Sequence, residues 1–158
     1  MSDHPITPAI RVLRAENVAF TPHTFDYVEK GGTAHSSKEL GVDEHAIVKT
    51  LVFEDEHRAP IVVLMHGDRE VSTKTLARII GVKMLKPCAP DVAERHSGYK
   101  VGGTSPFGLK RTLPIYMQQT ITTLERMYIN GGGRGFLVSL APSEAVRVLQ
   151  PTLVEAAQ

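Results

Sequence analysis

The sequence lacks the features that typify small secreted proteins and membrane proteins. Cys88 is the only cysteine, so no disulfide can form within the chain, which excludes the disulfide-rich class of secreted domains. The longest strongly apolar run covers residues 61–65, far short of the roughly 20 residues that a membrane-spanning helix needs. Residues 1–5 show no basic start followed by an apolar run. We therefore expect no secretory signal, no membrane partner and a cytoplasmic location.

The short motifs of nucleotide, metal and serine-nucleophile chemistry are also missing. Residues 103–110 have no lysine directly after their second glycine, which a phosphate-binding loop requires, and residues 131–135 lack the spacing of a dinucleotide-binding turn. The seven histidines form no H-E-x-x-H motif and no pair at the helical spacing of zinc ligands. No G-x-S-x-G motif is present. We expect no metal and no cofactor, and we expect Cys88 to pack as a small apolar side chain rather than act as an activated thiol.

The composition is that of an ordinary globular domain. The chain has 158 residues, of which 42% are hydrophobic and 22% charged, a balance that excludes wholesale disorder. No internal repeat, low-complexity tract or long linker divides the chain, so we predict one domain over residues 1–158.

The basic residues are concentrated in one part of the chain. From Arg69 to Arg111, nine lysine or arginine residues stand against three acidic ones. This segment carries a charge of +6, whereas the rest of the chain carries −5. Such a one-sided distribution suits a nucleic-acid ligand, although charge alone favours the plainer explanation of a solvated basic surface.

Hydrophobic spacing and capping residues predict a succession of short helices and strands. Thr7 is expected to cap a helix that begins at Pro8 and ends near Asn17, and Pro22 places an extended segment at a sheet edge. Further helices are expected over 36–41, 72–81, 90–98 and 142–149, and strands over 20–25, 47–53, 61–65, 82–85, 115–117, 127–130 and 136–140. Because several strands follow one another directly, we predict an α+β domain built on a mixed, curved β-sheet.

Two clusters contain eight of the thirteen glycines. The first covers residues 98–108 and the second covers residues 131–135, between two expected strands. Glycine lets a ligand approach the backbone and lets successive N–H groups point at one anion or carbonyl. Two turns explain the pattern without a ligand, but two clusters in one small domain, with hydroxyls at Thr104 and Ser105, favour a binding rim.

Lys49 interrupts an otherwise apolar strand. It follows Ala46-Ile47-Val48 and precedes Thr50-Leu51-Val52-Phe53. A lysine in this position either extends from an exposed sheet edge or points into a polar site. In a site, its ammonium would be a fixed positive charge for a carbonyl oxygen or a phosphate.

Five short motifs follow one another over about residues 7–149. They are Thr7-Pro8-Ala9, His23-Thr24, Val48-Lys49-Thr50-Leu51, Gly98-Tyr99-x-Val101-Gly102-Gly103-x-Ser105-Pro106-x-Gly108 and Gly131-Gly132-x-Arg134-Gly135. Together they resemble the YbaK family, the free-standing relatives of the editing domain of bacterial prolyl-tRNA synthetase. The resemblance implies that family's fold, with a partly barrel-like sheet surrounded by short helices. It also implies a deacylase that acts in trans on the acceptor end of mischarged tRNA, typically removing cysteine from the tRNA for proline or cysteine. A prolyl- or cysteinyl-tRNA synthetase is a candidate partner.

The resemblance further implies roles for individual residues. Lys49 resembles the family's central active-site lysine, which holds the substrate's backbone or terminal ribose-phosphate. Gly102, Gly103 and Ser105 resemble the loop whose backbone N–H groups approach the ester carbonyl, and with Lys49 they are the expected catalytic residues. The expected substrate-binding residues are Phe25, Thr50, Thr104, Pro106, Asn130, Gly131, Gly132 and Arg134.

A protein nucleophile is unnecessary in such a reaction. An aminoacyl ester is already activated, so positioning and oxyanion stabilisation by backbone donors can suffice. A cysteinyl substrate can attack its own ester through its thiol, whereas alanyl or seryl substrates need a bound water.

Three positions depart from the pattern of the cysteine-specific branch. Phe25, Asn130 and Leu137 stand where tyrosine, serine and aspartate are frequent. The pocket thereby lacks a phenol, a hydroxyl and a carboxylate, which leaves the edited amino acid open. A deacylase for alanine or serine, and a non-catalytic module that binds tRNA or a synthetase, are the alternatives.

Overall fold

The computed structural model describes residues 4–158 as five α-helices, eight strands and two 3-10 helices. In chain order these are α1 (Pro8–Ala15), β1 (Thr21–Thr24), α2 (Gly32–Leu40), η1 (Glu44–Ala46), β2 (Ile47–Asp55), β3 (Pro60–His66), α3 (Thr73–Ile80), β4 (Leu85–Pro87), α4 (Pro90–Ser97), β5 (Ile115–Gln118), η2 (Gln119–Thr123), β6 (Met127–Gly133), β7 (Phe136–Leu140), α5 (Pro142–Leu149) and β8 (Thr152–Val154). None of the described helices has the length and apolar character to cross a bilayer. Residues 1–3, part of the opening segment in which we expect no secretory signal, lie outside the described residues.

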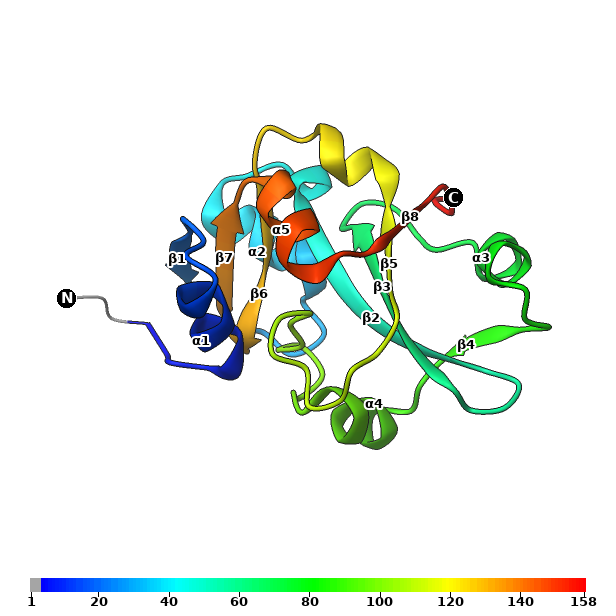
Figure 1. Ribbon diagram of the computed structural model, residues 1–158. Coiled ribbons are helices and arrows are strands. Elements are labelled where there is room, and N and C mark those ends of the chain that lie inside the picture. Colours follow the sequence, from blue (N-terminus) through cyan, green and yellow to red (C-terminus); the bar gives the residue numbers. More distant parts are fainter. Residues whose placement is uncertain (1–3) are drawn as a thin grey trace.

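The strands form one mixed sheet, as the sequence predicts. Their order is β1-β7-β6-β2-β3-β5-β8, and β4 pairs with β2 outside this path. Pairing is parallel between β2 and β6, β3 and β5, and β5 and β8, and it is antiparallel elsewhere. In Figure 1, α1 and α5 lie against the β6–β7 part of the sheet, whereas α3 lies beyond β4 at the other end. The α+β class is therefore confirmed, and β1, which carries Pro22, is an edge strand.

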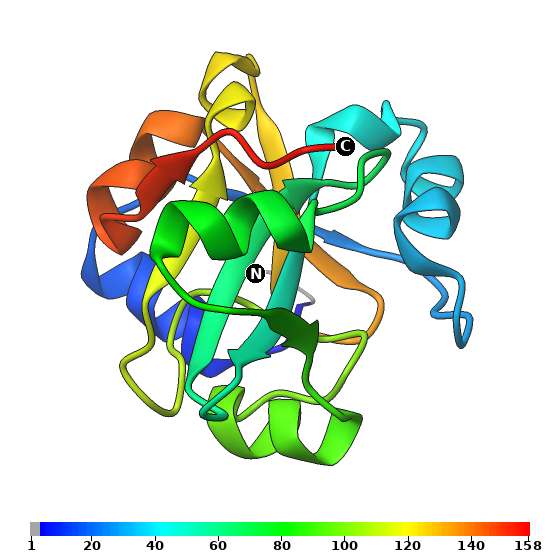
Figure 2. The same cartoon turned by 90° about the vertical axis from the view of Figure 1, so that its right-hand side faces the viewer.

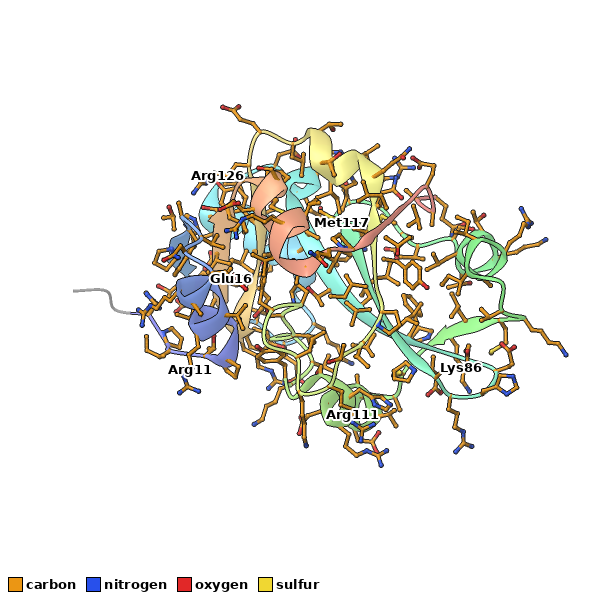
Figure 3. All side chains as sticks on the ribbon, viewed as in Figure 1. Arg11, Glu16, Lys86, Arg111, Met117 and Arg126 are labelled. Atoms are coloured by element: carbon orange, nitrogen blue, oxygen red, sulfur yellow. The ribbon has the colours of Figure 1, made fainter. Side chains whose placement is uncertain are left out.

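Buried clusters lie on both faces of the sheet. Val48 and Val62 point into the larger cluster, which α1 covers with Ile10 and other apolar side chains; Met117 in Figure 3 belongs to it. Val63 points the other way, into a smaller cluster that includes side chains of α3, and Figure 2 shows α3 crossing in front of β2 and β3. Because β3 contacts protein on both faces, the run 61–65 is apolar throughout rather than alternating.

Capping residues set the helix ends where the sequence predicts them. The Thr7 hydroxyl accepts from the backbone N–H of Ile10 at the start of α1, and the Ser72 hydroxyl accepts from that of Thr75 at the start of α3. Such caps satisfy donors that the first helical turn leaves free. The helices α2, α3 and α4 each end at a glycine in the left-handed conformation, namely Gly41, Gly81 and Gly98.

Three elements differ from the prediction. The helix expected to begin at Ser36 or Ser37 begins at Gly32. The strand expected over 82–85 is β4 at Leu85–Pro87, because pairing of Lys86 with Glu54 of β2 sets its position. The strand β8 follows Pro151, where we expected no strand. It joins the sheet by parallel pairing with β5.

Candidate functional site

One edge of β2 has a gap in its strand pairing. β3 covers the other edge from Val48 to Glu54. On the edge in question, β6 pairs with only Ile47 and Val48, and β4 joins at Phe53. Residues 49–51 therefore face no described strand along that edge, and we call this stretch the β2 gap. A place where two neighbouring strands diverge leaves backbone and side chains open to a ligand.

Lys49 opens the β2 gap and belongs to a row of side chains on one sheet face. Val48 and its partner on β6 point into the larger cluster, so Lys49 and Asn130, the next residue of each strand, point to the opposite face. Asn130 is paired with Leu137 of β7, which in turn is paired with His23 of β1. The row therefore runs across four neighbouring strands.

Lys49 is the cationic member of this row. The His23 ring lies 2.9 Å from the Ser139 hydroxyl, and burial, followed by the nearby Arg126 guanidinium, lowers the pKa of His23 below its usual range. A histidine so placed is neutral at pH 7, and its bonded nitrogen is directed at Ser139 rather than at the gap. The row thus offers one fixed positive charge and no carboxylate.

The Lys49 side chain is largely covered by protein. Its side chain is 18% exposed, and Nζ donates to the Arg69 carbonyl at 2.6 Å and to Glu70 Oε1 at 3.4 Å. Although Lys49 lies at the β2 gap, its mostly covered side chain and its two hydrogen-bond acceptors show that it does not extend freely into solvent from an exposed sheet edge. Within residues 4–158 the third N–H of the ammonium has no hydrogen-bond acceptor, so it is available to a ligand.

The carboxyl-terminal residues hold the segment that binds Lys49. Glu70 and Gln158 exchange backbone hydrogen bonds of 2.9 and 3.3 Å, and Arg69 Nε donates to the Gln158 carbonyl at 3.3 Å. An isolated bridge pairs Val71 with Ala157. The Arg69 carbonyl, and with it the Lys49 ammonium, is therefore positioned by the other end of the chain.

Asn130 links the two glycine clusters. Its Oδ1 accepts from the backbone N–H groups of Gly132 and Gly133, at 2.6 and 3.0 Å. Its Nδ2 donates to the Gly102 carbonyl at 3.2 Å. One side chain thus fixes the end of the β6–β7 hairpin and the exposed part of the loop 98–108 relative to each other.

The loop 98–108 is anchored from inside by Tyr99. The phenol donates to the Phe107 carbonyl at 2.6 Å, and burial raises the pKa of Tyr99 to about 12. The Gly103 amide is used within the loop, since it donates to the Lys100 carbonyl. By contrast, Gly102 is an exposed residue with a φ of 90°, and its amide donates to no acceptor among the described residues. The Gly102 amide is therefore available to a ligand at this rim, as are the neighbouring amides of Val101 and Thr104, which also have no acceptor among the described residues.

Two hollows adjoin the loop and share the side chains of Lys100 and Arg134. The smaller, of about 300 Å³, is floored by glycines of both clusters. The larger, of about 630 Å³, lies against α4 and is also lined by Arg95, Asp91 and Glu94. Figure 3 shows Lys86 and Arg111, two further basic residues of the segment 69–111, on separate parts of the molecule. The +6 segment is therefore not one continuous patch.

Comparison with known proteins decides the family. Residues 30–148 match the family model of the aminoacyl-tRNA editing domain. The chain belongs to this family. It is 31% identical over 137 residues to a protein of Enterococcus faecalis named "Putative Cys-tRNA(Pro)/Cys-tRNA(Cys) deacylase EbsC", covering 86% of this chain and 84% of the relative. It is also 27% identical over 105 residues to a proline–tRNA ligase of Limosilactobacillus fermentum, a match that covers 64% of this chain and 18% of the ligase.

Solved structures share the fold of this editing domain. The hypothetical protein APE2540 superimposes with a TM-score of 0.87 at 20% identity, covering 96% of this chain and 99% of the other. A protein described as "a putative trans-editing enzyme for prolyl tRNA synthetase" superimposes with a TM-score of 0.82 at 19% identity, covering 98% and 99%. These likenesses establish the expected editing-domain fold.

The editing domain brings most of the expected site residues to one rim. Gly102, Gly103, Asn130, Gly132 and Arg134 are joined by hydrogen bonds or close contacts. Gly131 is buried beside them and accepts from the Thr7 hydroxyl through its carbonyl. Phe25 reaches the hairpin by donating its backbone N–H to the Gly135 carbonyl.

Four expected residues have other surroundings. Thr50 points to the sheet face opposite Lys49, and its buried hydroxyl has no partner among the described residues. Ser105 is fully buried and accepts from the Phe107 N–H, so its hydroxyl does not reach the rim; Pro106 is also buried. The Thr104 hydroxyl donates to the Lys100 carbonyl and closes the loop on itself.

Sequence reasoning missed Tyr27. Its ring lies against Gly102 and under the Arg134 guanidinium, whose Cζ is 5.2 Å from the ring centroid. The signal that could have found it is its place two residues after Phe25, where the expected phenol is missing, because a tyrosine so close in the chain can supply a phenol to the same region.

The remaining candidate chemistry is absent from this rim. Burial, with the adjacent Glu54 carboxylate, raises the pKa of Cys88 to about 11, so its thiol stays protonated at neutral pH, in agreement with the expectation of an unactivated cysteine. Within residues 4–158, no group of three or more His, Cys, Asp or Glu side chains is arranged to hold a metal ion.

Proposed function

We propose that this editing domain is a trans-acting deacylase that removes a mischarged amino acid from tRNA, with cysteine attached to the tRNA for proline or cysteine as the preferred substrate. The observation that supports the proposal is the pair of contacts made by Asn130. Its side chain donates to the Gly102 carbonyl, and Asn130 follows the β6 residue that pairs with Val48, the residue before Lys49. The name of the E. faecalis relative points to the same substrate.

In the proposed reaction the Gly102 amide donates to the ester oxygen as negative charge develops on it. One such donor contributes roughly 3–4 kcal/mol to lowering a barrier of this kind. The third N–H of the Lys49 ammonium binds the terminal ribose-phosphate. No protein side chain acts as a nucleophile.

With a cysteinyl substrate, the thiol sulfur attacks the ester carbonyl carbon and forms a new C–S bond. The C–O bond to the ribose then breaks, the thiol proton ends on the ribose oxygen, and the amino acid leaves as a cyclic thiolactone. A cysteine thiol in water has a pKa of about 8.5 and is therefore partly ionised at neutral pH, so the substrate brings its own nucleophile.

A second candidate substrate class is a small amino acid such as alanine or serine. Leu137 favours it, because this buried side chain lies in the row directly opposite Asn130, at a position without a carboxylate to bind a polar substituent. A bound water would attack in that case. A methylene then contributes only about 1–3 kcal/mol of discrimination.

A panel of mischarged tRNAs tests the proposal. We expect release of cysteine from Cys-tRNA to be fastest, and release from S-methylcysteinyl-tRNA to be lost, because a methylated sulfur cannot attack. Release of alanine or serine at equal or greater rate would establish the second substrate class, and binding without release of any amino acid would establish a non-catalytic module. We also expect tRNA affinity to fall with increasing salt, since phosphate contacts release counterions.

A further inference from the structure

Tyr27 and Arg134 form an exposed stack beside the free amide of Gly102. The Tyr27 residue is 38% exposed, and the guanidinium carbon of Arg134 lies 5.2 Å from its ring centroid, within the range of a cation–π contact. A Cβ on Gly102 would lie 2.6 Å from the Tyr27 hydroxyl, so the ring borders the residue that carries the proposed donor.

The guanidinium is held in place by the loop beneath it. Arg134 Nε donates to the Val101 carbonyl at 3.0 Å, which orients the plane of the group. Within residues 4–158 its two terminal nitrogens have no hydrogen-bond acceptor. A planar, charged and oriented group therefore presents one face to Tyr27 and keeps its terminal N–H groups open to an anion.

The surroundings combine apolar and basic character. Tyr27, Val28 and Val101 are three of the exposed large apolar residues of the chain, and Lys100 and Arg134 form the shared wall of the two hollows. Nucleotides have flat apolar bases joined by phosphates, and proteins bind unpaired ones by stacking them on aromatic rings or guanidinium planes next to basic side chains.

We propose that the Tyr27–Arg134 stack is the platform for an unpaired nucleotide at the 3′ end of the RNA substrate. The base packs flat against this platform, and Lys100 with the terminal nitrogens of Arg134 binds the adjoining phosphates. This places the ester next to Gly102, and it rests on the proposed function for the identity of the RNA. Tyr27 and Arg134 are positioning residues in this arrangement.

A binding assay with uncharged tRNA tests the platform. The probes are tRNA for proline with its unpaired 3′ end intact and the same tRNA with that end removed. We expect Tyr27→Ala and Arg134→Lys each to weaken binding of the intact tRNA roughly 5- to 100-fold, the range for loss of one stacked base, and to leave binding of the trimmed tRNA unchanged. Tyr27→Phe retains the ring and is expected to restore the affinity, and melting temperatures verify that each variant is folded.

Arg134→Lys is the decisive variant because it keeps the charge and removes the plane. Arg111→Lys is its matched control, since Arg111 lies outside both hollows and contacts His96. Wild-type affinity in Arg134→Lys, or equal weakening for intact and trimmed tRNA, would overturn the platform. Unchanged tRNA affinity combined with lost binding to a prolyl-tRNA synthetase would assign the surface to a protein partner and also overturn it.

The assay contains no amino acid, so it separates the two proposals. If the wild type deacylates mischarged tRNA but binds intact and trimmed tRNA alike, the platform is wrong and the deacylase stands. If the variants lose binding of the unpaired end while the wild type releases no amino acid, the platform stands and the deacylase is wrong.

Discussion

The two glycine clusters are similar in sequence, but their backbone amides are bonded differently in the structure. In residues 98–108, Gly102 is exposed and has a φ of 90°, and its amide has no partner among the described residues. In residues 131–135, the amides of Gly132 and Gly133 are both taken by Asn130. The first cluster therefore offers a donor to a ligand, whereas the second is a scaffold.

The space available around the glycines also differs between the two clusters. A Cβ on Gly132 would lie 2.9 Å from Thr7 Cβ and from Tyr99 Cε1, both in well-packed surroundings, whereas a Cβ on Gly102 would meet the hydroxyl end of the Tyr27 side chain. The second cluster consists of glycine because the hairpin packs tightly against α1 and the first loop. A cluster of glycines thus indicates that another group comes close to the backbone. Whether that group is a ligand or another part of the chain is shown only by the hydrogen-bond partner of each glycine amide.

Lys49→Ala is expected to give the largest effect and to test whether the first cluster acts together with the sheet row. We expect deacylation to fall by at least ~100-fold, the scale for loss of one preorganised charge or donor, while the protein remains folded. The measurement is single-turnover release of the amino acid. Lys86→Ala is the matched control, because Lys86 also pairs with a glutamate on this sheet but lies on β4, and it should retain activity. Full activity of Lys49→Ala would remove the lysine from the mechanism.

Replacing glycine by alanine is expected to reduce mainly stability in the second cluster and mainly deacylation in the first. We expect Gly132→Ala to lower the free energy of unfolding by about 3 kcal/mol, from strain at positive φ and crowding. Gly102→Ala should cost about 1 kcal/mol but reduce deacylation about 10-fold or more by displacing the proposed donor. Urea unfolding and initial rates provide the two measurements.

Gly81→Ala is the control for backbone strain alone. Gly81 has a φ of 89° and nothing within 4 Å of its Cβ position, so its variant should lose about 1 kcal/mol and no activity. If Gly102→Ala behaves like Gly81→Ala in both measurements, the distinction between the clusters is wrong.

Asn130→Asp should break the link between the clusters without destroying the second one. The aspartate keeps the acceptor for Gly132 and Gly133 but cannot donate to the carbonyl of Gly102, which is an exposed residue. We expect stability to change by less than ~1 kcal/mol and kcat at saturating tRNA to fall about 10-fold, since a displacement of ~1 Å at a reacting group can cost more than this. An unchanged kcat would show that Asn130 only stabilises the hairpin.

Tyr99→Phe tests the anchor of the first cluster and should have the smallest effect. Leaving the buried Phe107 carbonyl unpaired should cost about 1–2 kcal/mol. Because the pKa of Tyr99 is raised to about 12 in the fold from about 10 in the unfolded chain, the folded state favours the neutral phenol. The contribution of the Tyr99 phenol to the free energy of unfolding is therefore full below pH 10 and is lost as the pH rises toward 12.

Urea unfolding at pH 9 and pH 11 provides the measurement for this anchor. We expect the stability difference between wild type and Tyr99→Phe to shrink at the higher pH. A stability difference that is the same at both pH values would mean that folding does not change the pKa of the Tyr99 phenol.

Local signals in the sequence were sufficient for most elements. The caps Thr7 and Ser72 and the terminal glycines of three helices act through hydrogen bonds within a few residues, so their effect is visible in the sequence. The start of α2 was not visible in the sequence, because Gly31-Gly32 is typical of a turn and the helix has no clear apolar face. The strands β4 and β8 depend on pairing with distant partners, which no local pattern reports.

The sequence singles out many residues that the structure brings to the candidate site, but it does not give their contacts, and it does not reveal that Thr50, Thr104, Ser105 and Pro106 have other surroundings. Lys49 was marked by its apolar neighbours, and the glycines by their clustering. Which amides are free, however, depends on where Asn130 directs its side chain, and the row on the sheet depends on the non-consecutive order β7-β6-β2. Tyr27 lies in a segment without regular structure, so periodicity carried no information about its position against Gly102.

The attachment of Gln158 to Arg69 and Glu70 makes the position of the proposed active lysine depend on a segment that is remote from it in the chain. Changes that break these contacts would release the carbonyl that orients the ammonium, while the pairing of β2 with β3 and the larger buried cluster, which Ala157 and Gln158 do not join, would stay intact. Loss of editing would then precede any loss of folded protein, and assays that monitor only folding would miss it.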